Sequence, residues 1–127
     1  PVGHQYPGKG RTNPQELEKL IHRFPHSKIV LAHWGGGILF YELMREISDL
    51  MSNVFYDTAA TPLLYKSEIF STSLNAVGAR KILFGSDYPL IDQKNILKIL
   101  NSQLLSREDK SSIYGKNAEN VFKIQRL

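Results

Sequence analysis

The chain has 127 residues, of which 42% are hydrophobic and 22% charged, a composition typical of one globular domain and unlike that of a disordered segment. Its formal net charge is +4, but Lys and Arg are scattered without a block of five, which excludes an obvious nucleic-acid footprint and leaves at most a weak preference for anionic small molecules. The absence of cysteine excludes disulfides and thiolate metal sites.

Because we find no signal peptide and no apolar run long enough to cross a bilayer, we expect a cytoplasmic protein without a membrane partner. The chain opens on PVGH without a methionine, and these residues resemble part of a strand. We therefore expect a fragment or a processed chain.

The first third of the chain predicts a helix followed by a buried strand. Residues 13–25, NPQELEKLIHRFP, carry one apolar stripe and a complete start signal, with Asn13 as N-cap, Pro14 at the first position and Glu16 closing a capping box. The run KIVLAH at 28–33 is typical of a strand covered on both faces of a parallel sheet.

Strand and helix signals alternate through the remaining chain. We expect helices at 38–51, 62–77 and 93–104, and a last helical stretch that begins at the capping box Ser106 to Asp109 and closes with NAENVFKI at 117–124. Strands are expected in NVFYDTAA at 53–60 and RKILFGSD at 80–87. This alternation predicts a single α/β domain over residues 1–127, built from parallel βα units.

Four polar residues lie at the predicted ends of successive strands, about 25 to 30 residues apart: His4, His33, Asp57 and Asp87. The carboxyl ends of parallel strands meet at one edge, where ligands bind in barrels and open sheets. Each residue alone is more often structural, since a strand-end histidine is commonly a satisfied core group and an aspartate a turn former. Together they predict a shared site for a divalent cation with nitrogen and oxygen ligands.

The segments IVLAHWGGG, NVFYDTAA and KILFGSDYP, with the closing NAENVFKI, resemble the second half of the amidohydrolase-related metal-dependent hydrolases, (β/α)8 barrels that include aminocarboxymuconate-semialdehyde decarboxylase. The resemblance implies strands five to eight of a TIM barrel. It also implies that His4 is a ligand of a divalent metal, most simply Zn²⁺, and that Asp87 is a metal ligand or the base that acts on metal-bound water. By the same resemblance, His33 polarises substrate or shuttles protons. Asp57 is left outside the catalytic set.

The resemblance predicts a hydrolase that acts on a small carboxylated or cyclic molecule through metal-activated water, or a related decarboxylase. No H-x-H pair occurs in the chain, and a barrel takes about 250 residues, so we expect this chain to be inactive alone. Two alternatives stay open. One is a non-catalytic half-barrel that forms a homodimer through its open sheet edges, and the other is a decayed reading frame.

Several other residues invite a functional interpretation. Trp34 and Tyr88 flank the candidate site and are predicted either to bind substrate or to pack at the barrel rim. His22 and His26 have zinc-pair spacing, but Pro25 between them favours a surface role. Ser86 lacks a nucleophile elbow, and the GKG at 8–10 lacks a phosphate-loop context, although Lys9 or Arg11 could meet an anionic group.

Overall fold

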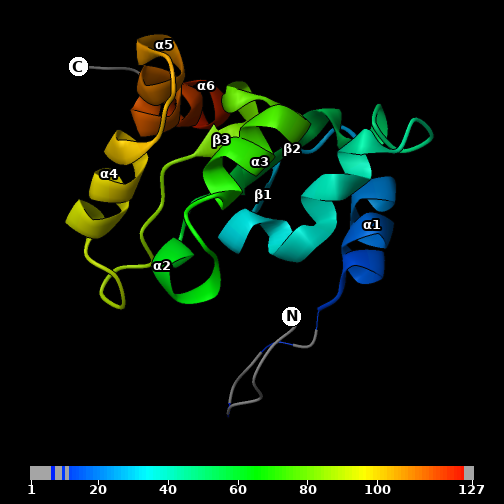
Figure 1. Ribbon diagram of the computed structural model, residues 1–127. Helices are drawn as coiled ribbons and strands as arrows, with labels where there is room; N and C mark the ends of the chain where they lie inside the picture. The colour runs from blue at the N-terminus through cyan, green and yellow to red at the C-terminus, as the bar shows by residue number, and fades with distance from the viewer. Residues whose placement is uncertain (1–6, 8–9, 11, 125–127) are drawn as a thin grey trace.

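The computed structural model describes residues 7, 10 and 12–124, and its centre is a parallel sheet of three strands (Figure 1). The strands are β1 (Ile29–Leu31), β2 (Val54–Asp57) and β3 (Ile82–Leu83), in the order β1-β2-β3. In the register of the sheet, Leu31 pairs with Tyr56, and Tyr56 pairs with Ile82. The predicted α/β class with parallel βα units is confirmed.

Helix α1 (Pro14–Arg23) forms as the sequence predicts. The Asn13 Oδ1 accepts from the Glu16 N–H at 3.0 Å, and the Glu16 carboxylate accepts from the Asn13 N–H at 3.1 Å. These two bonds satisfy amides that the first helical turn leaves without partners. Ile21 is buried in the core, whereas Phe24, beyond the end of the helix, is 46% exposed.

The α-helix predicted over 38–51 is wrong. The chain forms a 3₁₀ segment, η1 (His33–Leu43), interrupted by left-handed backbone from Trp34 to Gly37, and after a series of turns a second one, η2 (Leu50–Asn53). A 3₁₀ helix has three residues per turn, so an apolar pattern with a period of 3.6 does not stay on one side of it. Ile38 and Leu39 are accordingly buried, while the equally apolar Phe40, Leu43 and Met44 are exposed.

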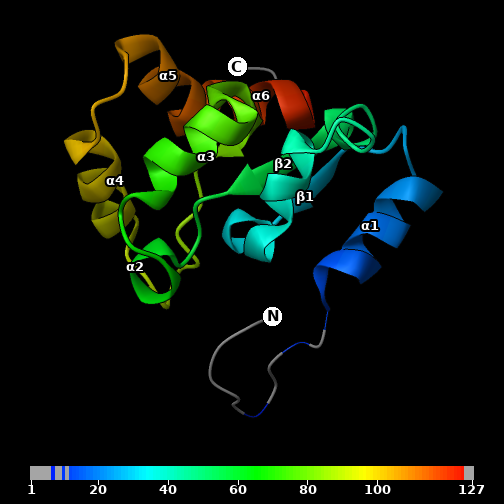
Figure 2. The same ribbon diagram turned by 45° about the vertical axis from the view of Figure 1, so that its right-hand side comes forward.

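The helices of the second half are mostly short. The predicted helix 62–77 divides into α2 (Thr61–Leu64) and α3 (Ile69–Val77), and the 3₁₀ turn η3 (Ala79–Lys81) precedes β3. The remaining elements are α4 (Gln93–Ser102), α5 (Arg107–Ser111), the π-helical η4 (Ser112–Lys116) and α6 (Asn117–Phe122). In both ribbon views α1 and α4 lie on opposite sides of the sheet, and α2 and α6 at its opposite ends (Figures 1 and 2).

The core lies on the sheet face that carries Leu31, Tyr56 and Ile82. Around them pack buried side chains from η1, α3, α4 and η4, which include Trp34, Ile38, Phe70, Leu100 and Ile113. Among the described residues, no helix combines the length and apolar character that a membrane span requires.

The C-terminal segment covers the outer edge of β3. The Phe84 N–H donates to the Ile113 carbonyl at 3.1 Å, and the Asn117 side-chain amide donates to the Ile82 carbonyl at 2.7 Å. The Leu83 carbonyl accepts from the Thr58 N–H, directly after β2. Successive residues of a strand turn their backbone groups to opposite sides, so the groups of Ile82 and Phe84 point away from β2. This edge, which was expected to be open, is occupied by the chain's own C-terminal segment.

Candidate functional site

The candidate site lies at the carboxyl ends of the three strands, the end of the sheet near α2 (Figure 1). His33 follows β1 by two residues, Asp57 is the last residue of β2, and Asp87 follows β3 by four residues. Parallel pairing brings these three positions to one edge. The fourth predicted position, His4, lies outside the described residues.

His33 and Asp87 face each other across this edge. The His33 Nε2 lies 3.5 Å from the Asp87 Oδ2, and each side chain is 42% exposed. Both residues have left-handed backbone, with φ of 55° and 70°. Residues with a side chain rarely adopt this region, and such positions gather at functional sites. The two side chains are within ion-pair distance of each other, and both stay accessible to a small molecule.

Asp57 takes no part in that pair. Its Oδ1 accepts from the His33 N–H at 2.8 Å and from the Ala59 N–H at 3.0 Å, which ties the end of β1 to the end of β2. A Cβ at Gly85 would lie 3.4 Å from the Asp57 Cβ, so the chain after β3 also passes close to this carboxylate. The structure thus gives Asp57 bonds to the backbone that carries His33.

Tyr65 contacts the same stretch of backbone from the other side. Its hydroxyl donates to the His33 carbonyl at 3.2 Å. Burial raises the pKa of the Tyr65 phenol, because a charged phenolate would lose its hydration. The donor proton therefore stays in place at neutral pH. Tyr65 stands directly after α2 and belongs to no motif, so no signal in the sequence identifies it as part of the site.

The structure places Trp34 in the core, away from any open surface. The indole is fully buried, its Nε1 donates to the Thr61 Oγ1 at 2.9 Å, and its ring stands edge-on to Phe70 with centroids 5.0 Å apart. Trp34 was predicted either to bind substrate or to pack at the barrel rim. A fully buried indole fits a packing role and cannot line a substrate pocket. Tyr88, beside Asp87, is 74% exposed.

The described residues do not complete a metal site. Among them no three His, Asp or Glu side chains come together, and His33 and Asp87 offer two donors. Zinc in proteins takes three or four protein ligands, so this pair fits a metal only if further ligands join it. His22 and His26, for which a surface role was expected, form no such site either, since the His22 Nε2 lies 3.8 Å from the Glu18 carboxylate and His26 lies beyond the end of α1. Lys9 and Arg11 lie outside the described residues.

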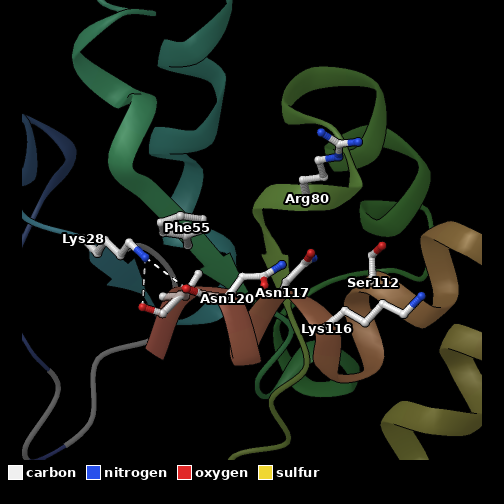
Figure 3. A pocket seen from close by; sticks show the side chains of 8 residues that line it. Lys28, Phe55, Arg80, Ser112, Lys116, Asn117 and Asn120 are labelled. Carbon is white, nitrogen blue, oxygen red and sulfur yellow. Dashed lines mark hydrogen bonds between the residues drawn. The ribbon is translucent and has the colours of Figure 1, made fainter. Parts of the chain in front are cut away.

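A hollow of about 330 Å³ lies at the opposite end of the sheet, against α6 (Figure 3). Lys28, Arg80 and Lys116 line it, together with Phe55 and residues of η4 and α6. Their charged ends lie apart on different sides of the hollow, and Lys28 donates to the backbone carbonyls of Asn120 and Val121 (Figure 3). The cations therefore do not converge on one point as they would around a bound anion.

Comparisons with known proteins agree with this arrangement. The amidohydrolase family model matches residues 6–124. Among curated proteins, the gamma-resorcylate decarboxylase of Polaromonas sp. JS666 is 25% identical over an alignment of length 124. The alignment covers 84% of this chain and 37% of that protein.

Solved structures share the fold. The dihydroxybenzoic acid decarboxylase of Polaromonas sp. JS666, with bound manganese and the inhibitor 2-nitroresorcinol, superposes with a TM-score of 0.74 at 22% identity, over 90% of this chain and 40% of that one. An amidohydrolase of Burkholderia multivorans with bound zinc gives a TM-score of 0.67 at 16% identity, over 88% and 49%. This chain thus spans less than half of each relative, as a partial barrel does, and it belongs to the amidohydrolase family.

Proposed function

We propose that this chain supplies the His33–Asp87 pair to the active site of an enzyme that decarboxylates a small hydroxylated aromatic acid. The observation that carries the proposal is the 3.5 Å approach of the two side chains at the carboxyl ends of parallel strands. The substrate class comes from the relatives, two of which are named for decarboxylation of resorcylic or dihydroxybenzoic acid.

The pair suits the proton chemistry of such a reaction. Decarboxylation breaks the bond between the ring carbon and the carboxyl carbon, releases CO₂, and leaves an electron pair on the ring carbon that must take up one proton. The His33 imidazole, beside the Asp87 carboxylate, can carry that proton and deliver it to the ring carbon. The half-exposed position of both side chains leaves room for a planar acid to approach. Gly36 and Gly37, a few residues after His33, carry no side chains, and a Cβ built on either would lie in open space.

A divalent cation is part of the expectation for the complete protein. The two relatives hold manganese in one case and zinc in the other, so zinc is one of at least two candidates. Asp87 would be one of its ligands, and His4 stays a predicted ligand outside the described residues. Because the described residues offer only two donors, the role proposed for this chain is the handling of a proton.

The test uses the 127-residue chain and a longer protein that includes the coding sequence upstream of Pro1, examined for an in-frame H-x-H. Each is incubated with 2,6-dihydroxybenzoate and Mn²⁺ or Zn²⁺, and CO₂ and resorcinol are measured. We expect turnover by the longer protein and none by the 127-residue chain. His33→Asn and Asp87→Asn should each lower kcat at least 100-fold, since general acid–base catalysis typically contributes about 10²–10⁴-fold.

His22→Asn is the matched control, because the exposed His22 side chain on α1 forms an ion pair with Glu18, away from the candidate site. Its kcat should equal that of the unchanged protein. If the longer protein releases no CO₂ from 2,6-dihydroxybenzoate but hydrolyses an amide or ester supplied in a parallel assay, the hydrolase alternative is favoured instead. Full activity of Asp87→Asn would contradict the role proposed for the pair.

A further inference from the structure

His33 and Trp34 form a strained pair at the candidate site. Their φ angles are 55° and 58°, and both residues carry large side chains. L-residues avoid this left-handed region because Cβ comes too close to the following carbonyl oxygen, and two successive examples need outside support. Without that support the chain would relax to ordinary backbone angles, and the imidazole of His33 would leave Asp87.

Three side chains from one neighbouring segment provide hydrogen bonds to this pair. Asp57 accepts from the His33 N–H at 2.8 Å, and Tyr65 donates to the His33 carbonyl at 3.2 Å. Thr61 accepts from the Trp34 indole at 2.9 Å, and its own hydroxyl donates to the Thr58 carbonyl. The three residues stand four apart along the chain, between the end of β2 and the residue after α2.

We propose that Asp57, Thr61 and Tyr65 are positioning residues that hold His33 in its left-handed conformation and so aim its imidazole at Asp87. This inference rests on the proposed function only for its effect on catalysis; the geometry itself can be tested without turnover. Asp57 and Tyr65 fix the two backbone polar groups of His33. Thr61 anchors the next residue through a fully buried side chain, so the stretch cannot swing as a unit.

The first test measures the geometry of His33 in the 127-residue chain. Tyr65→Phe removes one hydroxyl and keeps the ring. In ¹⁵N- and ¹³C-labelled protein, the His33 amide and imidazole signals should shift, and nuclear Overhauser contacts between the imidazole and the Asp87 side chain should weaken. Tyr114→Phe is the matched control: its hydroxyl also forms a hydrogen bond, to Asn101, but on η4 and α4, away from the site. It should leave the His33 signals unchanged.

Asp57 allows a second comparison. Asp57→Asn keeps a side-chain oxygen that can accept both backbone N–H groups, whereas Asp57→Leu keeps none. We expect Asp57→Leu to move the His33 signals and Asp57→Asn to restore them nearly to their original positions. If Asp57→Leu does not fold, Tyr65→Phe alone decides. Unchanged His33 signals in folded Tyr65→Phe would overturn the proposal.

The second test measures catalysis in the longer protein. Tyr65→Phe should lower kcat with 2,6-dihydroxybenzoate about 10- to 100-fold and change KM less than twofold, because misplacing a reacting group by about 1 Å costs rate more than binding. An unchanged kcat alongside shifted His33 signals would overturn the catalytic part of the proposal. Absence of turnover in the unsubstituted longer protein would contradict the proposed function, and the positioning of His33 would then be judged by the spectra alone.

Discussion

At the scale of single residues, Gly35 shows how closely the loop after His33 packs on the sheet. Its φ is +69°, and a Cβ built on it would lie 2.9 Å from the Ile38 Cγ2 and 3.0 Å from two ring carbons of Tyr56. Gly36 has a similar φ of +62°, but a Cβ there would meet nothing within 4 Å. The two glycines thus share one conformational requirement, and only Gly35 adds a steric one.

This difference predicts unequal effects of the same substitution. Gly36→Ala should lower the free energy of unfolding by about 1 kcal/mol, the cost of placing a side chain in left-handed backbone. Gly35→Ala should lower it by a further 1–3 kcal/mol or so, because the added methyl group forces the Tyr56 ring or Ile38 to move. Urea unfolding of both variants measures the difference. Equal losses would show that no close approach exists at Gly35.

The candidate residues differ in how far the sequence could locate them. His33 and Asp87 were predicted to meet because parallel strands end at one edge, and they lie 3.5 Å apart. Their supports could not be predicted, because Thr61 and Tyr65 act through hydrogen bonds to a backbone conformation that has no sequence signature. Trp34 could not be decided either, since an aromatic residue beside a site fits a pocket wall and a core equally well.

At the scale of elements, local signals decide what is predictable. Helix α1 begins at Asn13 as expected, because the cap, the proline and the capping box lie within four residues and need no distant partner. The apolar spacing of segment 38–51 fits a helix, but the five positive-φ residues that precede it, 33–37, and the packing of η1 on β2 determine the actual path. Tertiary contacts override a periodicity that is measured within one segment.

Helix α6 bonds to the start of β3 through the buried side chain of Asn117. The Asn117 amide donates to the carbonyls of Ala79 and Ile82, each at 2.7 Å, and the residue is 5% exposed. The two carbonyls lie just before β3 and within it, so Asn117 fixes the start of the outermost strand. The match of NAENVFKI to a family's terminal helix predicted the helix and not this contact.

Asn117→Ala should therefore lower the free energy of unfolding by about 2–4 kcal/mol. The change leaves two carbonyls without their donor, and a buried unsatisfied polar group costs about 1–3 kcal/mol. Asn75→Ala, on the exposed side of α3, is the control and should change stability by less than about 0.5 kcal/mol. Chemical denaturation measures both variants. A loss for Asn117→Ala no larger than for Asn75→Ala would contradict the assigned contact.

At the scale of the whole molecule, one buried polar network links three elements. The fully buried Tyr56 on β2 donates to the Glu42 carboxylate of η1 at 2.7 Å, and Lys81, before β3, pairs with the same carboxylate. Lys81 also donates to the Met51 carbonyl at 2.8 Å. Burial, above all, and the adjacent Glu42 raise the pKa of the Tyr56 phenol far above its ordinary value.

This shift predicts a loss of stability in alkali. Above pH 10 the phenol ionises in the unfolded chain but stays protonated in the folded one, so the unfolded state binds fewer protons and the free energy of unfolding falls as pH rises. The contribution of Tyr56 is about 1.4 kcal/mol per pH unit. Urea unfolding between pH 9.5 and 11.5 should show the free energy of unfolding falling with pH. In Tyr56→Phe this fall should be smaller by about 1.4 kcal/mol per pH unit. The same slope in both proteins would contradict the buried phenol.

The covered edge of β3 bears on whether two copies of the chain could close a barrel. Closure requires the free strand edges of one copy to pair with those of the other, because a barrel leaves no edge unpaired. The outward groups of Ile82 and Phe84 already bond to Asn117 and Ile113, so β3 cannot accept another strand unless the C-terminal segment leaves.

We therefore expect the 127-residue chain to stay a monomer of 14.5 kDa in light scattering from about 10 μM to several hundred μM, contrary to closure by two copies. Folded Asn117→Ala, whose β3 edge has lost one of its two bonds, should associate more readily than the unchanged chain, with Asn75→Ala again as control. If the unchanged chain dimerises, hydrogen exchange tells which surface it uses. A Phe84 amide that stays bonded to Ile113 means that the dimer forms through a surface other than this edge. A dimer in which that amide changes its partner would contradict the prediction and restore the two-copy barrel.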